Sequence, residues 1–240
     1  MTKEFLEVVK DSFFAYLNSG ARSNQKLKSL HSKIGEDILF KINQLSQNKE
    51  DKYKIVSINE NSSEEYLLHG RYIDKKIDIA ILKNNNFIAC ISVKFFMSNI
   101  KQNKNNYFEN MLGETANVRT QNYKYFQFIL MPISVPYFDK NKNIKKWEHV
   151  NESDLGKYFI MSHDNEILFF HVPNKTFIGL LQFPEVQANN FEEYKQAFIQ
   201  NQLFEIDFAK TLFKSEYGKQ LIINDYEEFI QKVAYAALSD

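Results

Sequence analysis

Two charged residues interrupt apolar segments in the first half of the chain. Asp78 lies within residues 76–82, where β-branched residues dominate, and Lys94 nearly ends the apolar run at residues 87–95. Charged side chains inside apolar strands are unfavourable unless they are paired, bind a metal ion or lie at an open edge. Asp78 alone is equally consistent with a solvated acid at a strand end, and Lys94 alone is more typical of a surface lysine. Together the two residues indicate a reactive site.

The two segments read as a β-hairpin whose turn lies near Asn85, since both arms are rich in β-branched residues and the turn is a run of asparagines. Arms of about equal length place Asp78 and Lys94 roughly level with each other. A carboxylate can hold Mg²⁺, which neutralises a phosphate and lowers the pKa of a bound water. A nearby lysine can orient or deprotonate that water and stabilise the transition state. The pair therefore favours phosphodiester hydrolysis.

Such a metal site needs a second acid. The segment at residues 106–118 is predicted to be a helix and carries two candidates, Glu114 and Glu109. Both flank the apolar stripe of this helix, so helical periodicity does not distinguish them.

These residues resemble the PD-(D/E)XK nuclease superfamily, whose signature is an acid on one strand and acid–any–lysine on the next. Asp78 matches the first acid, and Ser92-Val93-Lys94 matches the second motif with serine in place of the acid. One subgroup of restriction endonucleases has this serine form and takes its second acid from the following helix. Gln102-Asn103 and the stretch from Glu114 through Asn117 to Arg119 are similar to that helix. In addition, Glu36 resembles the extra helix glutamate that many members place near the metals.

The resemblance implies a type II restriction endonuclease that cuts double-stranded DNA. Asp78, Glu114 and the Val93 carbonyl would bind Mg²⁺, Lys94 would position or activate water, and Glu36 or Glu109 would be supporting or alternative acids. A palindromic site implies a homodimer or a tetramer, and a cognate DNA methyltransferase would protect the host. The residues expected to contact DNA are Lys101, Gln102, Asn103, Lys104 and Arg119.

The recognition site itself is not implied. Relatives with this helix read a CCGG core with an arginine and an aspartate after the strand lysine, whereas this chain has Phe95 to Lys101 there, without that pair. Residues 101–106 are almost as consistent with a plain polar loop that does not contact DNA. Two other functions stay open: a site-independent repair or defence nuclease of the same fold, and a non-catalytic DNA-binding subunit, which the serine at position 92 would permit.

The surrounding elements predict an α/β fold with a mixed central sheet flanked by helices, similar to restriction endonucleases. We expect one domain over residues 1–240, with a catalytic core at about 24–135 and recognition or dimerisation elements at about 150–240. Predicted helices cover residues 3–18, 23–45, 106–118, 154–161 (with Ser153 as N-cap), 191–202 and 225–238. Predicted strands cover residues 53–58, 76–82, 87–95, 123–131, 167–172 and 176–182.

Composition narrows the class of protein. The 240 residues carry no net charge and are 44% hydrophobic, which fits a folded protein and weighs against one that coats nucleic acid non-specifically. A single cysteine excludes an intramolecular disulfide and a cysteine-based zinc site. The five histidines are scattered, so we interpret them as structural. The charged N-terminus does not resemble a signal peptide and no apolar run is long enough to span a membrane, so we expect a cytoplasmic protein.

Overall fold

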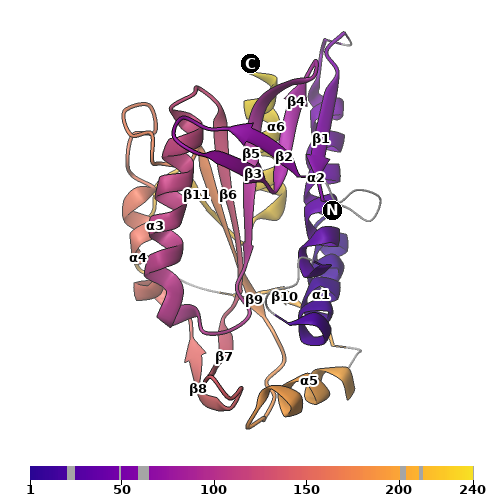
Figure 1. Cartoon of the computed structure of the whole chain (residues 1–240), viewed down its shortest axis with the longest axis vertical. Coiled ribbons are helices and arrows are strands. Elements are labelled where there is room, and N and C mark those ends of the chain that lie inside the picture. The colour runs from indigo at the N-terminus through magenta and orange to yellow at the C-terminus, as the bar shows by residue number, and fades with distance from the viewer. Residues whose placement is uncertain (21–24, 49, 59–64, 201–203, 211–212, 240) are drawn as a thin grey trace.

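A mixed, curled sheet forms the centre of the computed structural model (Figure 1). The structure describes residues 1–20, 25–48, 50–58, 65–200, 204–210 and 213–239. The strand order is β1-β4-β5-β6-β9-β10, and β11 also pairs with β9. The strands are β1 (Tyr53–Ser57), β4 (Ile79–Lys83), β5 (Asn86–Phe95), β6 (Lys124–Pro132), β9 (Lys175–Gln182), β10 (Asp207–Phe208) and β11 (Leu221–Ile223).

The direction of the strands changes at β5. Strands β1, β4 and β5 are antiparallel, whereas β5, β6 and β9 are parallel. The β4–β5 turn contains Asn84 and Asn85, both with positive φ (51° and 66°), a backbone conformation that asparagine tolerates better than most residues. A parallel partner needs a crossover, which α3 (Ile100–Arg119) supplies between β5 and β6.

Helices cover both faces of the sheet (Figure 1). On one face, α1 (Thr2–Ser19), α2 (Gln25–Leu45) and α6 (Tyr226–Leu238) pack on the larger core, while α3 and α4 (Glu152–Met161) cover the other face. Strand β6 is buried on both sides: Phe126 and Phe128 belong to the first core, and Ile129 to the second. The expected mixed sheet between helices is therefore confirmed.

Smaller elements complete the fold. A two-stranded sheet of β2 (Tyr66–His69) and β3 (Asp74–Ile77) lies across the front in Figure 1, and another joins β7 (Ser134–Phe138) to β8 (Ile144–His149). Helix α5 (Phe191–Gln200) packs on α1 through Phe198, whose ring centroid lies 4.9 Å from that of Phe13. Because β9 and α6 belong to the central sheet and its cover, the last third of the chain also builds the core.

Most predicted elements are confirmed, and four details are wrong. Residues 101–106, interpreted as a polar loop, form the first turns of α3. Residues 167–172 form turns and no strand. The strand predicted at 76–82 breaks at Asp78, and the N-cap of α4 is Asn151, whose side chain accepts a hydrogen bond from the Asp154 amide. The predicted helix end at 201–202 lies outside the described residues. Among the described helices, none is long and apolar enough to cross a membrane.

Candidate active site

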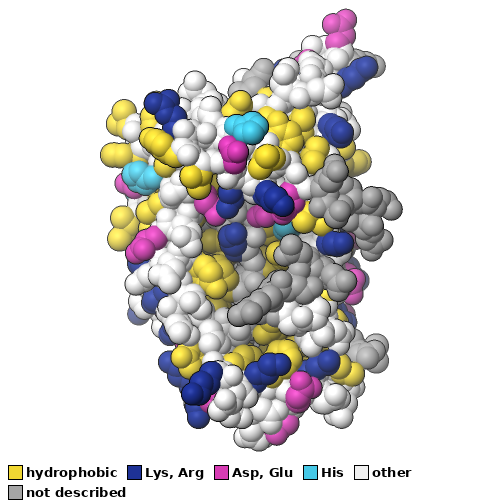
Figure 2. All heavy atoms as spheres, viewed as in Figure 1, with side chains coloured by type: hydrophobic (Ala, Val, Ile, Leu, Met, Phe, Trp, Pro, Cys, Tyr) yellow, Lys and Arg dark blue, Asp and Glu magenta, His cyan; other side chains and the backbone are white. Residues whose placement is uncertain are grey.

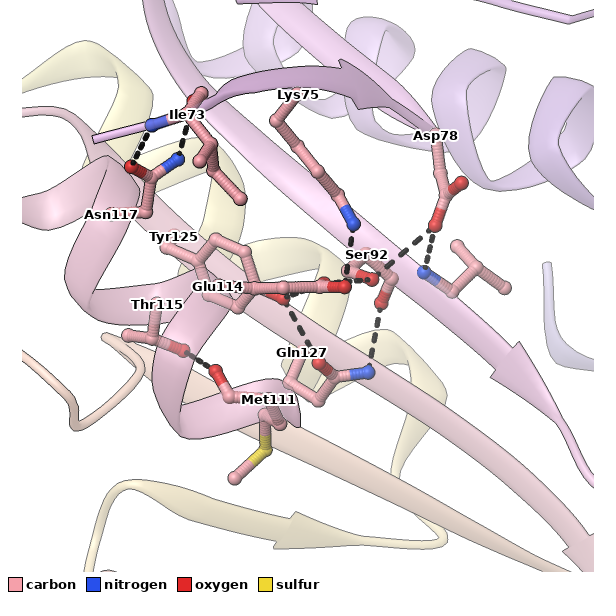
Figure 3. A network of polar contacts seen from close by, with 11 residues as sticks. Ile73, Lys75, Asp78, Ser92, Met111, Glu114, Thr115, Asn117, Tyr125 and Gln127 are labelled. Atoms are coloured by element: carbon pink, nitrogen blue, oxygen red, sulfur yellow. Dashed lines mark hydrogen bonds and ion pairs between the residues drawn. The ribbon is translucent and has the colours of Figure 1, made fainter. Parts of the chain in front are cut away.

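Asp78 lies where the chain passes from the small β2–β3 sheet into the central sheet. It belongs to neither ladder, so its side chain bonds instead to the neighbouring strand β5. Its Oδ2 atom accepts a hydrogen bond from the Val93 amide at 2.8 Å and lies 3.3 Å from the Ser92 hydroxyl (Figure 3). The carboxylate is thereby fixed against the strand that carries Lys94.

Asp78 and Lys94, which we expected to be roughly level, are offset by two residues. Ile79 pairs with Ile91, so Asp78 lies beside Ser92, and Lys94 follows two residues later on the same face of the strand. An irregularity between Ile81 and Leu82 shifts the register by one residue and brings Asp78 one residue closer to Lys94 than the turn alone would.

Glu114 reaches the same position from helix α3. Its Oε2 atom lies 3.5 Å from the Ser92 hydroxyl and 3.2 Å from the hydroxyl of Tyr125, on β6 (Figure 3). Ser92 therefore lies between two carboxylates that are 36 positions apart in the sequence. The two acids thus converge on Ser92, the serine that replaces the acid of the second motif.

Lys94 is half-buried beside these acids. It lines a cavity of about 160 Å³ together with Glu114 and Gln127, and aromatic side chains of α3, of α4 and of the residue that follows β5 also line the cavity. Within the described part of the chain, its ammonium forms neither a hydrogen bond nor an ion pair. The three donors of its ammonium are therefore not taken up by these side chains.

Buried groups beneath the site hold it in place. The Gln127 side chain donates to the Ser92 carbonyl at 3.2 Å and lies 3.2 Å from the Tyr125 hydroxyl. Burial, followed by the charge of Glu114, raises the pKa of Tyr125 well above its usual value, so the phenol stays protonated and donates. Burial likewise raises the pKa of Cys90, which is a buried residue of β5.

A second lysine, which the sequence did not indicate, completes the polar network. Lys75 extends from β3, and its ammonium lies 2.5 Å from the Oε1 atom of Glu114 (Figure 3). Figure 2 shows basic and acidic side chains gathered near the middle of this face. The alternation of β3 carried a weak signal, because it directs Lys75 and Lys76 to opposite sides, but nothing in the sequence distinguished the inward lysine.

His31 is a further residue that was not singled out. It lies on α2 with 3% exposure, and neither ring nitrogen has a hydrogen-bond partner among the described residues. Gly35, one helical turn after His31, lies close to the side chain of Ile79, the first residue of β4. His31 is therefore near the start of β4, next to Asp78. Burial lowers the pKa of His31; the Asp78 charge opposes this shift and the Lys94 charge adds to it.

The other candidate acids lie elsewhere. Glu36 is exposed on α2 and accepts a hydrogen bond from Ser32 at 2.9 Å. Glu109 is also exposed. The structure thus brings Glu114, and not Glu109, to Ser92. The roles of Glu36 and Glu109 as supporting acids stay predictions.

The predicted DNA-contacting residues divide into two groups. Lys101 and Lys104 lie 3.2 and 2.7 Å from the carboxylate oxygens of Asp154, and the neighbouring Gln102 and Asn103 approach Asn99. Arg119 is only 9% exposed. Its guanidinium donates to the carbonyls of Glu166, Phe169 and Val172. In this arrangement Arg119 anchors the turns that follow α4.

The donors at the site suit a hard divalent cation. Two carboxylates and a hydroxyl are oxygen ligands of the kind that Mg²⁺ prefers, and water molecules usually complete the coordination of this ion. Among the described residues, no group of three or more His, Cys, Asp or Glu side chains is arranged to hold a metal ion. Comparison with protein-family models, curated proteins and solved structures found no match.

Proposed function

We propose that this protein is a Mg²⁺-dependent DNA endonuclease of the restriction type, with a restriction-endonuclease-like core. The observation that carries the proposal is the convergence of Asp78 and Glu114 on the Ser92 hydroxyl, at 3.3 and 3.5 Å, beside Lys94. The mixed sheet, with an antiparallel hairpin followed by a helix and a parallel strand, supports it as well.

Asp78 and Glu114 would hold Mg²⁺ together with the Val93 carbonyl. When bound, the ion would neutralise charge on the scissile phosphate and lower the pKa of a water molecule. The Val93 amide donates to Asp78, and the Tyr125 hydroxyl lies within donating distance of Glu114. These two contacts orient the carboxylates. Both carboxylates are thereby held beside Ser92 before the ion binds.

Lys94 would orient or deprotonate the attacking water. Its ammonium is half-buried, lines the cavity next to Glu114 and forms no ion pair among the described residues, so it is available to a water or a phosphate oxygen. A donor held in a partly dehydrated site stabilises developing negative charge more strongly than one in bulk water. The products would carry 5′-phosphate and 3′-hydroxyl ends.

The partners follow from the reaction. The substrate would be double-stranded DNA, and a palindromic site would require two active sites related by a two-fold axis, hence a homodimer or a tetramer. A cognate DNA methyltransferase would protect the host. The elements after residue 150 that lie outside the central sheet would contribute to recognition or assembly.

The test is digestion of unmethylated phage DNA by the purified chain, with Mg²⁺ and with EDTA. Lys94→Ala is compared with Lys54→Ala, which removes an exposed lysine from β1. We expect discrete fragments that require Mg²⁺, persist in Lys54→Ala and vanish in Lys94→Ala. A smear would instead indicate a site-independent nuclease. Intact DNA from several sources would favour a non-catalytic DNA-binding subunit.

A further inference from the structure

Lys75 forms an ion pair with Glu114, one of the two carboxylates that would hold the metal ion. Its ammonium lies 2.5 Å from Oε1 of Glu114, and the two side chains are only 31% and 20% exposed. The other oxygen, Oε2, faces the hydroxyls of Ser92 and Tyr125. Both oxygens of Glu114 are therefore engaged, and the only charged partner among the described residues is Lys75.

The ion pair balances a local excess of negative charge. Asp78 and Glu114 both approach one serine hydroxyl, and like charges this close repel each other. Lys94 is near but forms no ion pair within the described residues. Lys75 is thus the cation that holds Glu114 at the site when no divalent ion is bound.

A divalent cation bound to Glu114 would lie close to the Lys75 ammonium. Two positive charges a few ångströms apart repel strongly in a partly buried site. The ammonium therefore disfavours metal binding as long as it stays at Glu114, and its movement away from Glu114 removes this repulsion.

The backbone near Lys75 is fixed, so only the side chain has to move. Asn117, two residues before the end of α3, accepts hydrogen bonds from the Tyr72 and Ile73 amides at 2.9 and 3.2 Å, and it donates to the Ile73 carbonyl at 3.0 Å. The β2–β3 sheet is thereby attached to α3. The flexible four-carbon stem of lysine allows the ammonium to leave while the strand stays in place.

We propose that Lys75 is an internal counter-ion of Glu114 which an incoming divalent cation displaces, so that Lys75 sets the metal affinity of the site. Lys75 is a positioning residue in this scheme: it holds Glu114 and competes with the metal ion. The inference rests on the proposed function, because it assumes that Glu114 is a metal ligand.

The test is calorimetric titration of the full chain with Mn²⁺ in the absence of DNA. Lys75→Met should bind Mn²⁺ about fivefold more tightly than wild type, the effect expected for removing a competing, partly exposed ion pair. Lys75→Arg keeps the charge and should not tighten binding. Lys76→Met is the matched control, since Lys76 is the adjacent lysine, 74% exposed, and should leave the affinity unchanged. Glu114→Gln should abolish binding.

The outcomes separate this inference from the proposed function. If wild type binds Mn²⁺, Glu114→Gln does not, and Lys75→Met binds equally or more weakly, Lys75 does not compete and only the inference fails. If wild type binds no Mn²⁺, both fail. Circular dichroism and urea unfolding of Lys75→Met establish that it is folded. If it is not, Lys75→Gln replaces it with the same expectation.

Discussion

Asn117 attaches the β2–β3 sheet to helix α3, and its replacement should weaken that attachment measurably. The side chain is 4% exposed and makes three hydrogen bonds with the backbone of Tyr72 and Ile73. A hydrogen bond contributes about 1 kcal/mol net, and a buried partner left unsatisfied raises the loss. Tyr72 and Ile73 are themselves exposed, so water replaces part of what is lost. We therefore expect Asn117→Ala to destabilise the protein by about 2–3 kcal/mol.

Asn117→Asp separates the contributions. It keeps the acceptor for the two amides but replaces the donor to the Ile73 carbonyl with a charged oxygen. Loss of one hydrogen bond and repulsion between two acceptors should destabilise by about 1–3 kcal/mol. The control is Asn106→Ala, an exposed asparagine on the same helix, which should change stability by less than about 0.5 kcal/mol.

Urea unfolding measures the free energies, and native-state hydrogen exchange at the Tyr72 and Ile73 amides detects local detachment of β2–β3. We expect faster exchange at these two amides in Asn117→Ala, and a smaller increase in Asn117→Asp, which keeps their acceptor. If both variants match wild type in unfolding free energy and in exchange, the attachment does not depend on Asn117.

Two further predictions concern buried cations and imidazoles. Arg119→Met should destabilise the protein by about 3–5 kcal/mol, because three carbonyls lose a buried guanidinium, and Arg119→Lys should not restore these hydrogen bonds since lysine lacks the planar fork. The control is Arg71→Met, which changes an exposed arginine. An unfolding free energy of Arg119→Met in urea within about 1 kcal/mol of wild type would contradict this role. Burial lowers the pKa of His31, so the unfolded chain binds the extra proton below about pH 6.5 and wild type loses up to about 1.4 kcal/mol per pH unit there. Between pH 7.5 and 5.5, His31→Leu should therefore lose less stability than wild type, whereas the control His149→Gln, at an exposed histidine, should lose as much as wild type. Parallel curves of unfolding free energy against pH for all three proteins would refute the role of His31.

The sequence was informative where a charge interrupts an apolar strand. Asp78 and Lys94 were visible for that reason, and Glu114 because a helix with an acid follows directly. The distance of each from Ser92 depended on hairpin register, and the irregularity at Ile81 and Leu82 could not be read from residue types. The sequence pattern predicted that Asp78, Lys94 and Glu114 lie in one region, whereas the register of the hairpin determined which atoms of these residues are in contact.

What the sequence did not reveal depends on contacts distant along the chain. Lys75 meets Glu114 across 39 positions, and the hydrogen bonds of Asn117 to Ile73 span 44. The early start of α3 has a similar origin: the Lys101 amide donates to Glu148 at 3.0 Å, and Asp154 binds Lys101 and Lys104. Local propensity at residues 101–106 favoured a loop, and these tertiary partners override it.

The exposed apolar run at residues 167–172 misled for a different reason. Ile167, Leu168, Phe169 and Phe170 have the composition of a buried strand, but Ile167 is 79% exposed and Phe170 44%. The carbonyls of this segment bond to the Arg119 guanidinium instead of a neighbouring strand. A strand predicted from composition needs a neighbouring strand to bond with its backbone. Here carbonyls of the segment bond instead with the side chain of Arg119.

The most direct test of the proposed active site compares Glu114→Gln with Glu109→Gln in Mg²⁺-dependent cleavage of phage DNA. Both variants remove one charge from the same helix, but only Glu114 approaches Ser92 and Asp78, while Glu109 is exposed. We predict that Glu114→Gln lowers the cleavage rate by at least about 100-fold, whereas Glu109→Gln cleaves like wild type. Equal rates for Glu114→Gln and wild type, or loss of activity in Glu109→Gln alone, would contradict the assignment of Glu114 as the second acid.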